Sequence, residues 1–263
     1  MLRAMRSAAS GMKAQQLYLD TVAHNLANVN TVGFKANRVG FEDLLYQTMT
    51  PVSTPSGEGA ARPTAIQVGH GSRPSDTSKV FSQGDSEVTG NPLDLLVQGD
   101  GFFQVQLLDG TTGYTRDGEF HLDGNSRLVT ANGNLIQPEI VLPADATSVA
   151  ISPDGRVLVE QAGQQTQTEV GQLLLARFVN PAGLVAEGEN LYRDTGGAGD
   201  PQLGAPGDAG IGQILQGSLE RSNVEVVEEM VNMILAQRAF EVSSKAIKAA
   251  DDMMGVAASI RPA

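Results

Sequence analysis

The sequence predicts an α+β protein: an antiparallel β middle domain, with N- and C-terminal helices that form a coiled-coil-like inner domain. Three observations lead to this fold class. Apolar residues recur with a helical period at both ends of the chain. Between about Val80 and Val179 they alternate with a period of two, and Asp-Gly and Asn-Gly pairs separate the strand-like runs. The acidic excess of the chain lies entirely in its middle.

The N-terminal helix is predicted from the stretch Met5 to Lys35. Its seam consists of two rows with a spacing of seven residues, of which only one member is polar: Met5, Met12, Leu19 and Leu26, and Ala8, Gln15, Val22 and Val29. Asn28, Asn30 and Gly33 then tolerate the left-handed backbone that ends a helix. Because such a narrow seam cannot be buried alone, it needs a partner helix.

The comparable pattern lies near the C-terminus. Ser222-Asn223 can cap a helix that runs to about Met254, and three glutamates near its start favour the helix dipole. Its predicted seam alternates spacings of four and three: Val226, Met230, Met233, Gln237, Phe240, Ser244, Ile247, Asp251 and Met254. The three polar members cost stability but restrict register and partner. Residues 1–35 and 221–263 are therefore predicted to form one terminal helical assembly domain.

Residues 36–79 are predicted to be a connector and an extended arm. Over 36–49 the apolar spacing is too irregular to assign an element. Residues 50–76 are rich in Pro, Gly, Ser and Thr, which is typical of a loop or of an arm that becomes ordered against a neighbour. Within this segment, the run AIQVG at 65–69 can form one short strand.

Residues 80–220 are predicted to form the antiparallel β domain, as a meander or an irregular barrel. Asp154-Gly155 is one of its expected hairpin turns. The run VGQLLLARFV indicates a longer, more buried strand, whereas residues 180–217 have loop composition.

Composition argues against several classes of protein. The 263 residues include no Cys, which removes disulfides, thiol catalysis and Cys-type zinc sites. A cleaved signal peptide and membrane insertion are not expected, because there is no apolar h-region and no run near the ~20 apolar residues that span a bilayer. With 8 basic and 21 acidic residues, 51–220 disfavours nucleic acid and anionic membranes as partners.

No catalytic site, metal site or cofactor is predicted. His24, His70 and His121 lie in unrelated contexts without metal-ligand spacing. Gly99-Asp100-Gly101 completes neither a dinucleotide fingerprint nor a Walker motif, and a tight turn explains it. None of the Asp-Gly turns matches an EF-hand loop. An acidic β domain always supplies carboxylates for glycoside hydrolysis, but nothing here singles out a pair.

The apolar seams leave two arrangements open. Both helices could pack on the β core of an ordinary monomer, or they could mediate assembly between chains. Two features favour assembly: the seams are narrower than a globular helix face, and the Pro/Gly/Thr-rich loop beside them has no evident core to cover.

Three long motifs resemble a known family. The segments SGMKAQQLYLDTVAHNLANVNTVGFKA, NPLDLLVQGDGFFQVQLLDGTTGYTRDGEFHLDGNSRLVTANGNLIQP and QGSLERSNVEVVEEMVNMILAQRAFEVSSKAIKAADDMM occur in this order. They are similar to the N-terminal, middle and C-terminal motifs of the flagellar rod and hook axial proteins. The resemblance covers nearly the whole chain.

The resemblance implies a non-enzymatic structural subunit that self-assembles into a helical tube, the periplasm-spanning distal rod of the bacterial flagellum. The tube would transmit torque from the motor to the hook and pass export substrates. The implied partners are further copies of the chain, other rod proteins, the hook protein, the surrounding P and L rings and the flagellar type III export apparatus, which exports these proteins without a cleaved signal. The alternatives are a proximal rod paralogue of similar length, or a secreted β-domain protein that binds wall polysaccharide.

The resemblance also implies which residues belong to the subunit assembly region. Together with Met12 and Ile247 of the seams, these residues are Leu19, Val22, Asn25, Leu26, Asn28, Asn30, Thr31, Gly33, Phe34, Asn223, Val224, Met230, Ile234, Gln237, Arg238, Phe240 and Lys245. The family usually has Tyr at the position of Phe240, so a hydrogen bond from a hydroxyl group there is in doubt.

Overall fold

The computed structural model describes residues 2–50, 65–161, 167–208 and 210–259. Their chain contacts divide the protein into two compact units. Unit 1 comprises residues 1–26, 37–78 and 226–263, and unit 2 comprises residues 27–36 and 79–225. Both ends of the chain and the arm thus belong to one unit, and the middle region forms the other.

Unit 1 contains two helices and four strands. Helix α1 spans Leu2–Ala27 and helix α2 spans Val226–Ser259. The strands are β1 (Asn37–Asp43), β2 (Tyr46–Thr50), β3 (Ile66–Gly69) and β4 (Ser72–Lys79). Strand β1 pairs with β4, and β2 pairs with β3 in antiparallel register. The predicted short strand at 65–69 is confirmed by β3, whereas the unassigned segment 36–49 proves to hold β1 and the start of β2.

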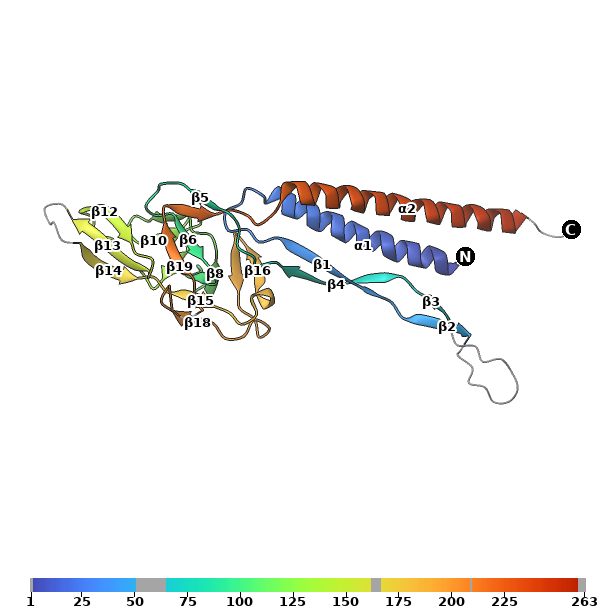
Figure 1. The fold of residues 1–263 in the computed structure, drawn as a ribbon, viewed down its shortest axis with the longest axis horizontal. Coiled ribbons are helices and arrows are strands. Elements are labelled where there is room, and N and C mark those ends of the chain that lie inside the picture. The colour runs from blue at the N-terminus through green and yellow to red at the C-terminus, as the bar shows by residue number, and fades with distance from the viewer. Residues whose placement is uncertain (1, 51–64, 162–166, 209, 260–263) are drawn as a thin grey trace, which may run out of the picture. The chain divides into compact units, whose positions relative to one another are not determined.

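The two helices of unit 1 lie antiparallel (Figure 1). Asn25 near the end of α1 contacts Glu229 near the start of α2, and a Cβ atom built on Gly11 would lie 3.8 Å from the Ser243 hydroxyl. These two contacts show that the helices run in opposite directions. The arm also contacts α1, because the rings of Tyr18 and Phe41 meet edge-to-face at a centroid distance of 6.1 Å.

Unit 2 is built from short antiparallel strands and one 3-10 turn. Its elements are β5 (Ser86–Val88), β6 (Leu95–Gln98), β7 (Phe102–Gln106), β8 (Thr112–Thr115), β9 (Phe120–Leu122), β10 (Leu128–Thr130), β11 (Leu135–Gln137), β12 (Ala146–Ile151), β13 (Arg156–Gln161), β14 (Thr168–Gln172), β15 (Leu175–Arg177), the 3-10 turn Pro181–Gly183, β16 (Val185–Gly188), β17 (Leu191–Arg193), β18 (Gln202–Gly204), β19 (Gln213–Gln216) and β20 (Ser218–Glu220).

The largest sheet of unit 2 has nine strands. Seven follow the order β16-β17-β8-β7-β11-β10-β9, and β15 pairs with both β7 and β18. Strands β12, β13 and β14 form a second sheet, while β19 pairs with β6 and β20 with β5. The order departs from a simple meander, because β11 and β15 both lie beside β7. The α+β fold class predicted from the sequence is confirmed.

Strand β7 is covered on both faces, which places it at the centre of unit 2. Phe103 packs edge-to-face on Phe120 in the larger core, at a centroid distance of 5.1 Å. The preceding residue, Phe102, points to the opposite face of the strand. It belongs to a second cluster with Phe178 and Tyr192. Successive side chains of a strand point to opposite faces, so the pair of phenylalanines joins the two cores.

Several sequence expectations for unit 2 need correction. Residues 180–217 have loop composition, yet they contain β16, β17, β18 and β19. These strands are three or four residues long and separated by glycine-rich turns, so their period-two signal is too short to detect. The hairpin turn at Asp154-Gly155 is confirmed, with Gly155 at φ 80°. The part of the predicted arm at 51–64 lies outside the described residues.

A glycine just before β9 tests this packing. A Cβ on Gly118 would lie 1.7 Å from the carbonyl oxygen of Leu95, whose amide donates to the Gly118 carbonyl at 3.0 Å. Gly118→Ala must therefore push two paired backbones apart. We expect it to lower the free energy of unfolding by about 3 kcal/mol in urea unfolding followed by tyrosine fluorescence.

Gly124→Ala is the matched control. A Cβ added to Gly124 would have no atom within 4 Å, and Gly124 has no positive φ. This change should stay within about 0.5 kcal/mol of the parent. Equal effects of the two substitutions would contradict the close backbone approach at Gly118.

Candidate assembly site

Helix α2 turns a row of small side chains toward the interior of unit 1. Ala236 and Ala250 are buried, and Ser243 between them is half-buried. With Glu229 these residues repeat every seven positions along one face of the helix. The row lies one residue earlier than the predicted row Met230, Gln237, Ser244 and Asp251, of which only Ser244 is half-buried.

The predicted seam of α2 is wrong in this row because it follows the large side chains. In the second predicted row Met233, Ile247 and Met254 are half-buried, whereas Val226 and Phe240 are exposed. Close approach near Gly11 of α1 admits small side chains between the helices, because the distance between helix axes depends on the side chains at the contact. Large apolar residues of α2 are consequently left on its other face.

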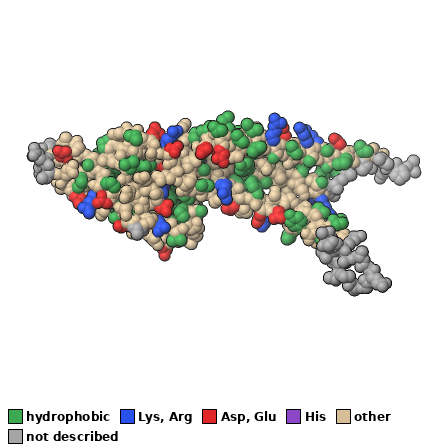
Figure 2. Space-filling view, in the orientation of Figure 1, with side chains coloured by type: hydrophobic (Ala, Val, Ile, Leu, Met, Phe, Trp, Pro, Cys, Tyr) green, Lys and Arg blue, Asp and Glu red, His purple; other side chains and the backbone are tan. Residues whose placement is uncertain are grey.

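The outward face of α2 carries an apolar stripe. Its members are Val227, Met230, Val231, Ile234, Leu235 and Val242, whose exposed fractions run from 50% to 76%. Their spacing of three, four and seven places them on one face, about half a turn from the buried row. Figure 2 shows hydrophobic side chains gathered over the first part of this helix. An apolar face of this kind marks a surface for association.

A buried asparagine links three elements of unit 1. The Asn25 side chain is 2% exposed, and its amide nitrogen donates to Glu229 Oε1 at 2.7 Å and to the Asn37 carbonyl at 2.9 Å. Its carbonyl oxygen accepts from the Asn37 amide at 2.9 Å. Helices α1 and α2 and the first residue of β1 therefore meet at one side chain. Burial, and then Glu229 and Glu228, raise the pKa of the nearby Tyr18 phenol.

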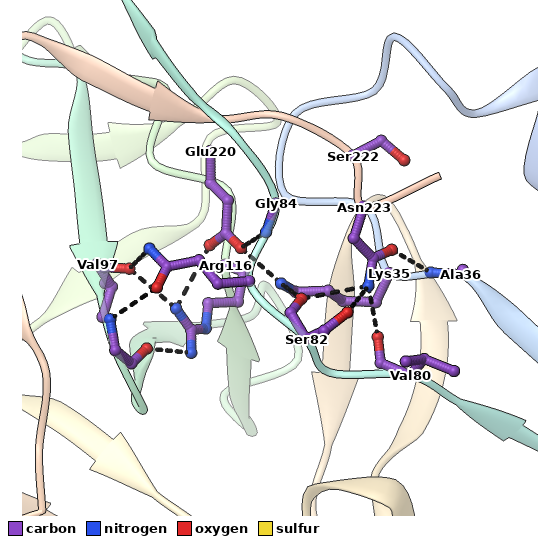
Figure 3. A network of polar contacts seen from close by, with 12 residues as sticks. Lys35, Ala36, Val80, Ser82, Gly84, Val97, Arg116, Glu220, Ser222 and Asn223 are labelled. Carbon is purple, nitrogen blue, oxygen red and sulfur yellow. Dashed lines mark hydrogen bonds and ion pairs between the residues drawn. The ribbon is translucent and has the colours of Figure 1, made fainter. Parts of the chain in front are cut away.

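In unit 2 both terminal motifs meet at a buried carboxylate (Figure 3). Glu220 Oε1 accepts from Lys35 Nζ at 2.5 Å and from the Gly84 amide at 3.0 Å. Glu220 Oε2 lies 3.4 Å from Arg116 Nη1. The three charged side chains are each less than 5% exposed. A buried charge persists only when it is paired and hydrogen-bonded, so these groups depend on one another.

Backbone carbonyls complete this charge network. Lys35 Nζ also donates to the Ser82 carbonyl at 2.7 Å, and Arg116 donates to the Val97 and Gly99 carbonyls at 3.1 and 2.6 Å. Loss of hydration lowers the pKa of both Lys35 and Arg116, and Glu220 opposes that effect. Among the described residues, Arg116 Nε has no hydrogen-bond partner. The network thus holds two cations and one anion, with carbonyl dipoles offsetting the remaining positive charge.

The segment that follows α1 is fixed to unit 2 by backbone contacts. The Gly33 amide donates to the Glu220 carbonyl at 2.7 Å, and Asn190 Nδ2 donates to the Val32 carbonyl at 3.1 Å. Gly33 has φ 67°, and a Cβ there would lie 2.7 Å from the Arg116 backbone. Glycine is thus required at this position both for its conformation and for space.

Asn223 has a different role from the predicted helix cap. Because α2 begins at Val226, neither Ser222 nor Asn223 caps it. Asn223 Oδ1 instead accepts from the Ala36 amide at 2.8 Å, and Nδ2 donates to the Val80 carbonyl at 2.8 Å. Asn223 therefore joins the chain before α2 to the segments on both sides of the arm. The helix also extends past the predicted end at Met254, to Ser259.

The residues predicted to mediate assembly fall into three structural sets. Those buried or half-buried in unit 1 are Met12, Leu19, Val22, Asn25, Leu26 and Ile247. Those that pack into unit 2 are Asn28, Thr31, Gly33, Phe34, Asn223 and Val224, while Asn30 of the same segment is exposed. Those exposed along α2 are Met230, Ile234, Gln237, Arg238, Phe240 and Lys245.

The charge network is not predicted from the sequence. Lys35, Arg116 and Glu220 lie inside the quoted motifs, but a buried charged residue has no periodic signature that separates it from a surface one. The only available signal is the position of Lys35 and Glu220 directly beside the apolar residues Phe34 and Leu219. None of the helices described here is long and apolar enough to cross a membrane.

The charge network makes a prediction about stability. Lys35→Met leaves the buried Glu220 carboxylate without its closest cation, and we expect a loss of about 3 kcal/mol in urea unfolding. Adding Glu220→Gln to this variant should lower stability further, because Arg116 is then buried without its carboxylate partner.

Arg156→Met in the same unit is the control. It removes an ion pair to Asp154 in which both side chains are more than half exposed. Its effect should not exceed about 0.5 kcal/mol. A double variant more stable than Lys35→Met alone would show that Arg116 does not depend on Glu220.

Comparisons with known proteins agree with the three motifs. Residues 5–35 match the family model of the flagella basal body rod protein, residues 96–159 match the flagellar hook protein FlgE/F/G D1 domain, and residues 215–260 match the flagellar basal body rod FlgEFG protein C-terminal region.

Relatives match over the full length of the chain. The flagellar basal-body rod protein FlgG of Borreliella burgdorferi is 47% identical over 263 residues, covering 99% of each chain. FlgG of Caulobacter vibrioides is 44% identical and covers 99% of this chain and 100% of its own. The flagellar hook protein FlgE of Helicobacter mustelae is 44% identical over only 52% of this chain and 30% of its own. The chain therefore belongs to the family of flagellar basal-body rod proteins, on the FlgG branch.

Proposed function

We propose that the chain is a structural subunit of the flagellar distal rod, which polymerises into a helical tube and catalyses no reaction. Full-length similarity to FlgG proteins supports the rod assignment over the hook protein and over the proximal rod paralogue FlgF. The tube transmits torque from the motor to the hook, and export substrates pass through its channel.

The observation that carries this proposal is the outward apolar stripe of α2. One face of α2 packs within unit 1, and the opposite face still exposes Val227, Ile234 and Leu235. This stripe meets a different surface of the next copy, because a heterologous contact whose rotation does not close generates an open helical polymer. Burial of the stripe then supplies the driving force for polymerisation.

Unit 2 forms the outer part of the tube in this proposal. Its acidic surface faces the periplasm and the surrounding P and L rings, while the near-neutral ends of the chain form the inner layer. Other rod proteins adjoin it below and the hook protein above. The subunit reaches this place through the flagellar type III export apparatus, without a cleaved signal.

The terminal helices pair only transiently in the free monomer and become stably ordered when the subunit joins the tube. Before that, the stripe on α2 would be exposed to water, and disorder of the ends prevents early polymerisation. The cost of ordering the helices is met at the growing tip, where a neighbour covers them.

A charged residue in the stripe tests polymerisation. Leu235 is 60% exposed, so Leu235→Asp should leave the fold of unit 2 unchanged while placing a carboxylate in the buried contact between copies. We expect loss of swimming, and basal bodies without a distal rod in electron micrographs, when the variant replaces the native protein in its own bacterium.

Gln16→Asp serves as the control, because Gln16 is exposed on the polar face of α1. It introduces the same charge and should preserve swimming. If Leu235→Asp bacteria also assemble complete rods, the stripe does not lie between subunits.

Limited proteolysis tests the order of events. With disordered ends, trypsin should cut the monomer after Lys13 and Lys245, with fragment masses read by mass spectrometry. Lys35 should escape, because its side chain is 0% exposed and bound to Glu220 in unit 2. Because no Lys or Arg lies between residues 14 and 34, the resistant fragment should begin at residue 14.

The pattern of cuts decides between two accounts. Protection of Lys13 and Lys245 would mean that the helices already pack stably within one chain, and the assembly step would then need another trigger. Rapid cleavage after Lys35 would show that the network around Glu220 does not form in the monomer.

A further inference from the structure

Two contacts fix the register of α1 against α2. Asn25 meets Glu229, and Gly11 meets Ser243, so the contacts lie two heptads apart in both helices. The intervening α1 residue on this row is Tyr18, and its counterpart on α2 is Ala236. The helices thus face each other with rows that repeat every seven residues.

Side-chain size alone does not select this register. A slip by one heptad, about 10 Å along the axis, would place Gly11 opposite Ala236 or Ala250 instead of Ser243. Each of these α2 residues is small, and both alanines are at least 96% buried. The small side chains of this α2 row therefore do not select the register by themselves.

The polar contact at Asn25 does distinguish the registers. In the observed register, its amide nitrogen reaches Glu229 Oε1 at 2.7 Å, and both of its amide atoms pair with the Asn37 backbone. A slip that places Asn25 opposite Ala236 removes the carboxylate. Glu229 is then left without this partner, and the Asn25 amide keeps only its bonds to β1. An unsatisfied buried polar group costs more than a neutral apolar contact gains.

We propose that Asn25 is the register-determining residue of unit 1, which fixes α1 at once against α2, through Glu229, and against the arm, through the backbone of Asn37. Its side chain pairs with Asn37 in both directions, as a neighbouring strand would. Helix pairing and the start of β1 are therefore set together. A single buried Asn plays this part in coiled coils, where it selects register at a cost in stability.

The register has a consequence that rests on the proposed function. It fixes the position of the outward stripe of α2 along the axis of each subunit. A helical polymer needs that stripe at the same height in every copy, so one slipped subunit would disrupt the next contact. The register itself is a property of the single chain and can be tested without assembly.

Disulfide trapping in the full-length monomer tests the proposal, because oxidation captures the two helices whenever they pair. The chain has no native cysteine that could form a competing disulfide. Three reporter pairs each contain Gly11→Cys: with Ser243→Cys for the observed register, and with Ala236→Cys or Ala250→Cys for the two slipped ones. The Gly11 position tolerates a side chain, because its nearest neighbour is 3.8 Å away. Oxidation is followed at low protein concentration, and cross-links are mapped by mass spectrometry.

With Asn25 in place, the Ser243 pair should oxidise and the two slipped pairs should not. Asn25→Leu keeps the shape of the side chain but removes its hydrogen bonds, and should raise cross-linking of a slipped pair at least ~10-fold. Glu229→Gln keeps an acceptor for Asn25 and should preserve the observed register. Gln16→Leu, a polar-to-apolar change on the exposed face of α1, should also preserve it.

Glu229→Leu removes the same hydrogen bond from the side of α2. It provides a second test of the register if Asn25→Leu fails to fold. Circular dichroism at 222 nm shows whether each variant keeps its helices. Helical Leu variants that cross-link only through Ser243 would overturn the proposal. Loss of helicity in both Leu variants would overturn it too, because the Asn25 contact would then supply stability rather than register. If the parent chain cross-links only through Ser243 but does not polymerise, that result would count against the proposed function and not against the role of Asn25.

Discussion

The buried carboxylate of Glu220 is the constraint on which unit 2 depends. It lies on β20, next to the start of α2, and its partners come from the segment after α1, from the end of β8 and from the chain before β5. Replacing such a network with apolar residues often costs nothing in stability. Removing one member is costly, because the others remain buried and charged. The network therefore acts mainly by disfavouring other arrangements. A terminal segment that docked elsewhere would leave an unpaired charge in the core.

Helix α2 shows how a subunit can be folded and still ready to associate. Its small residues face α1, where Gly11 permits close approach, and its larger apolar residues face outward. A helix that is apolar on two faces belongs in the interior of a larger structure. Within one chain only one of these faces is covered. The arrangement assigns the small side chains to the intramolecular contact and reserves the larger apolar area for a neighbour.

Regular periodicity makes the fold class predictable, and its absence explains the errors. Both helices and the hairpin at Asp154-Gly155 follow from patterns that persist over many residues. Strands β16 to β19 are too short to show such a pattern. One row of the predicted α2 seam is displaced by one residue, because Met230 is larger and more apolar than Glu229, although Glu229 faces α1. Asn223 resembles a helix cap because Asn favours that position, yet tertiary contacts use its side chain elsewhere.

Apolar contacts and buried polar contacts have different roles in assembly: the first supply stability, and the second select the arrangement. Apolar burial is strong but non-directional, and the small side chains of the α2 row do not select a register by themselves. Asn25 in unit 1 and Glu220 in unit 2 make directional contacts, each of which is satisfied in the observed arrangement. In a polymer the same contact recurs in every subunit, so an error in one copy propagates to the next. Selection of a single arrangement is then worth more than added stability, and this explains why polar groups occupy positions where apolar residues would pack as well.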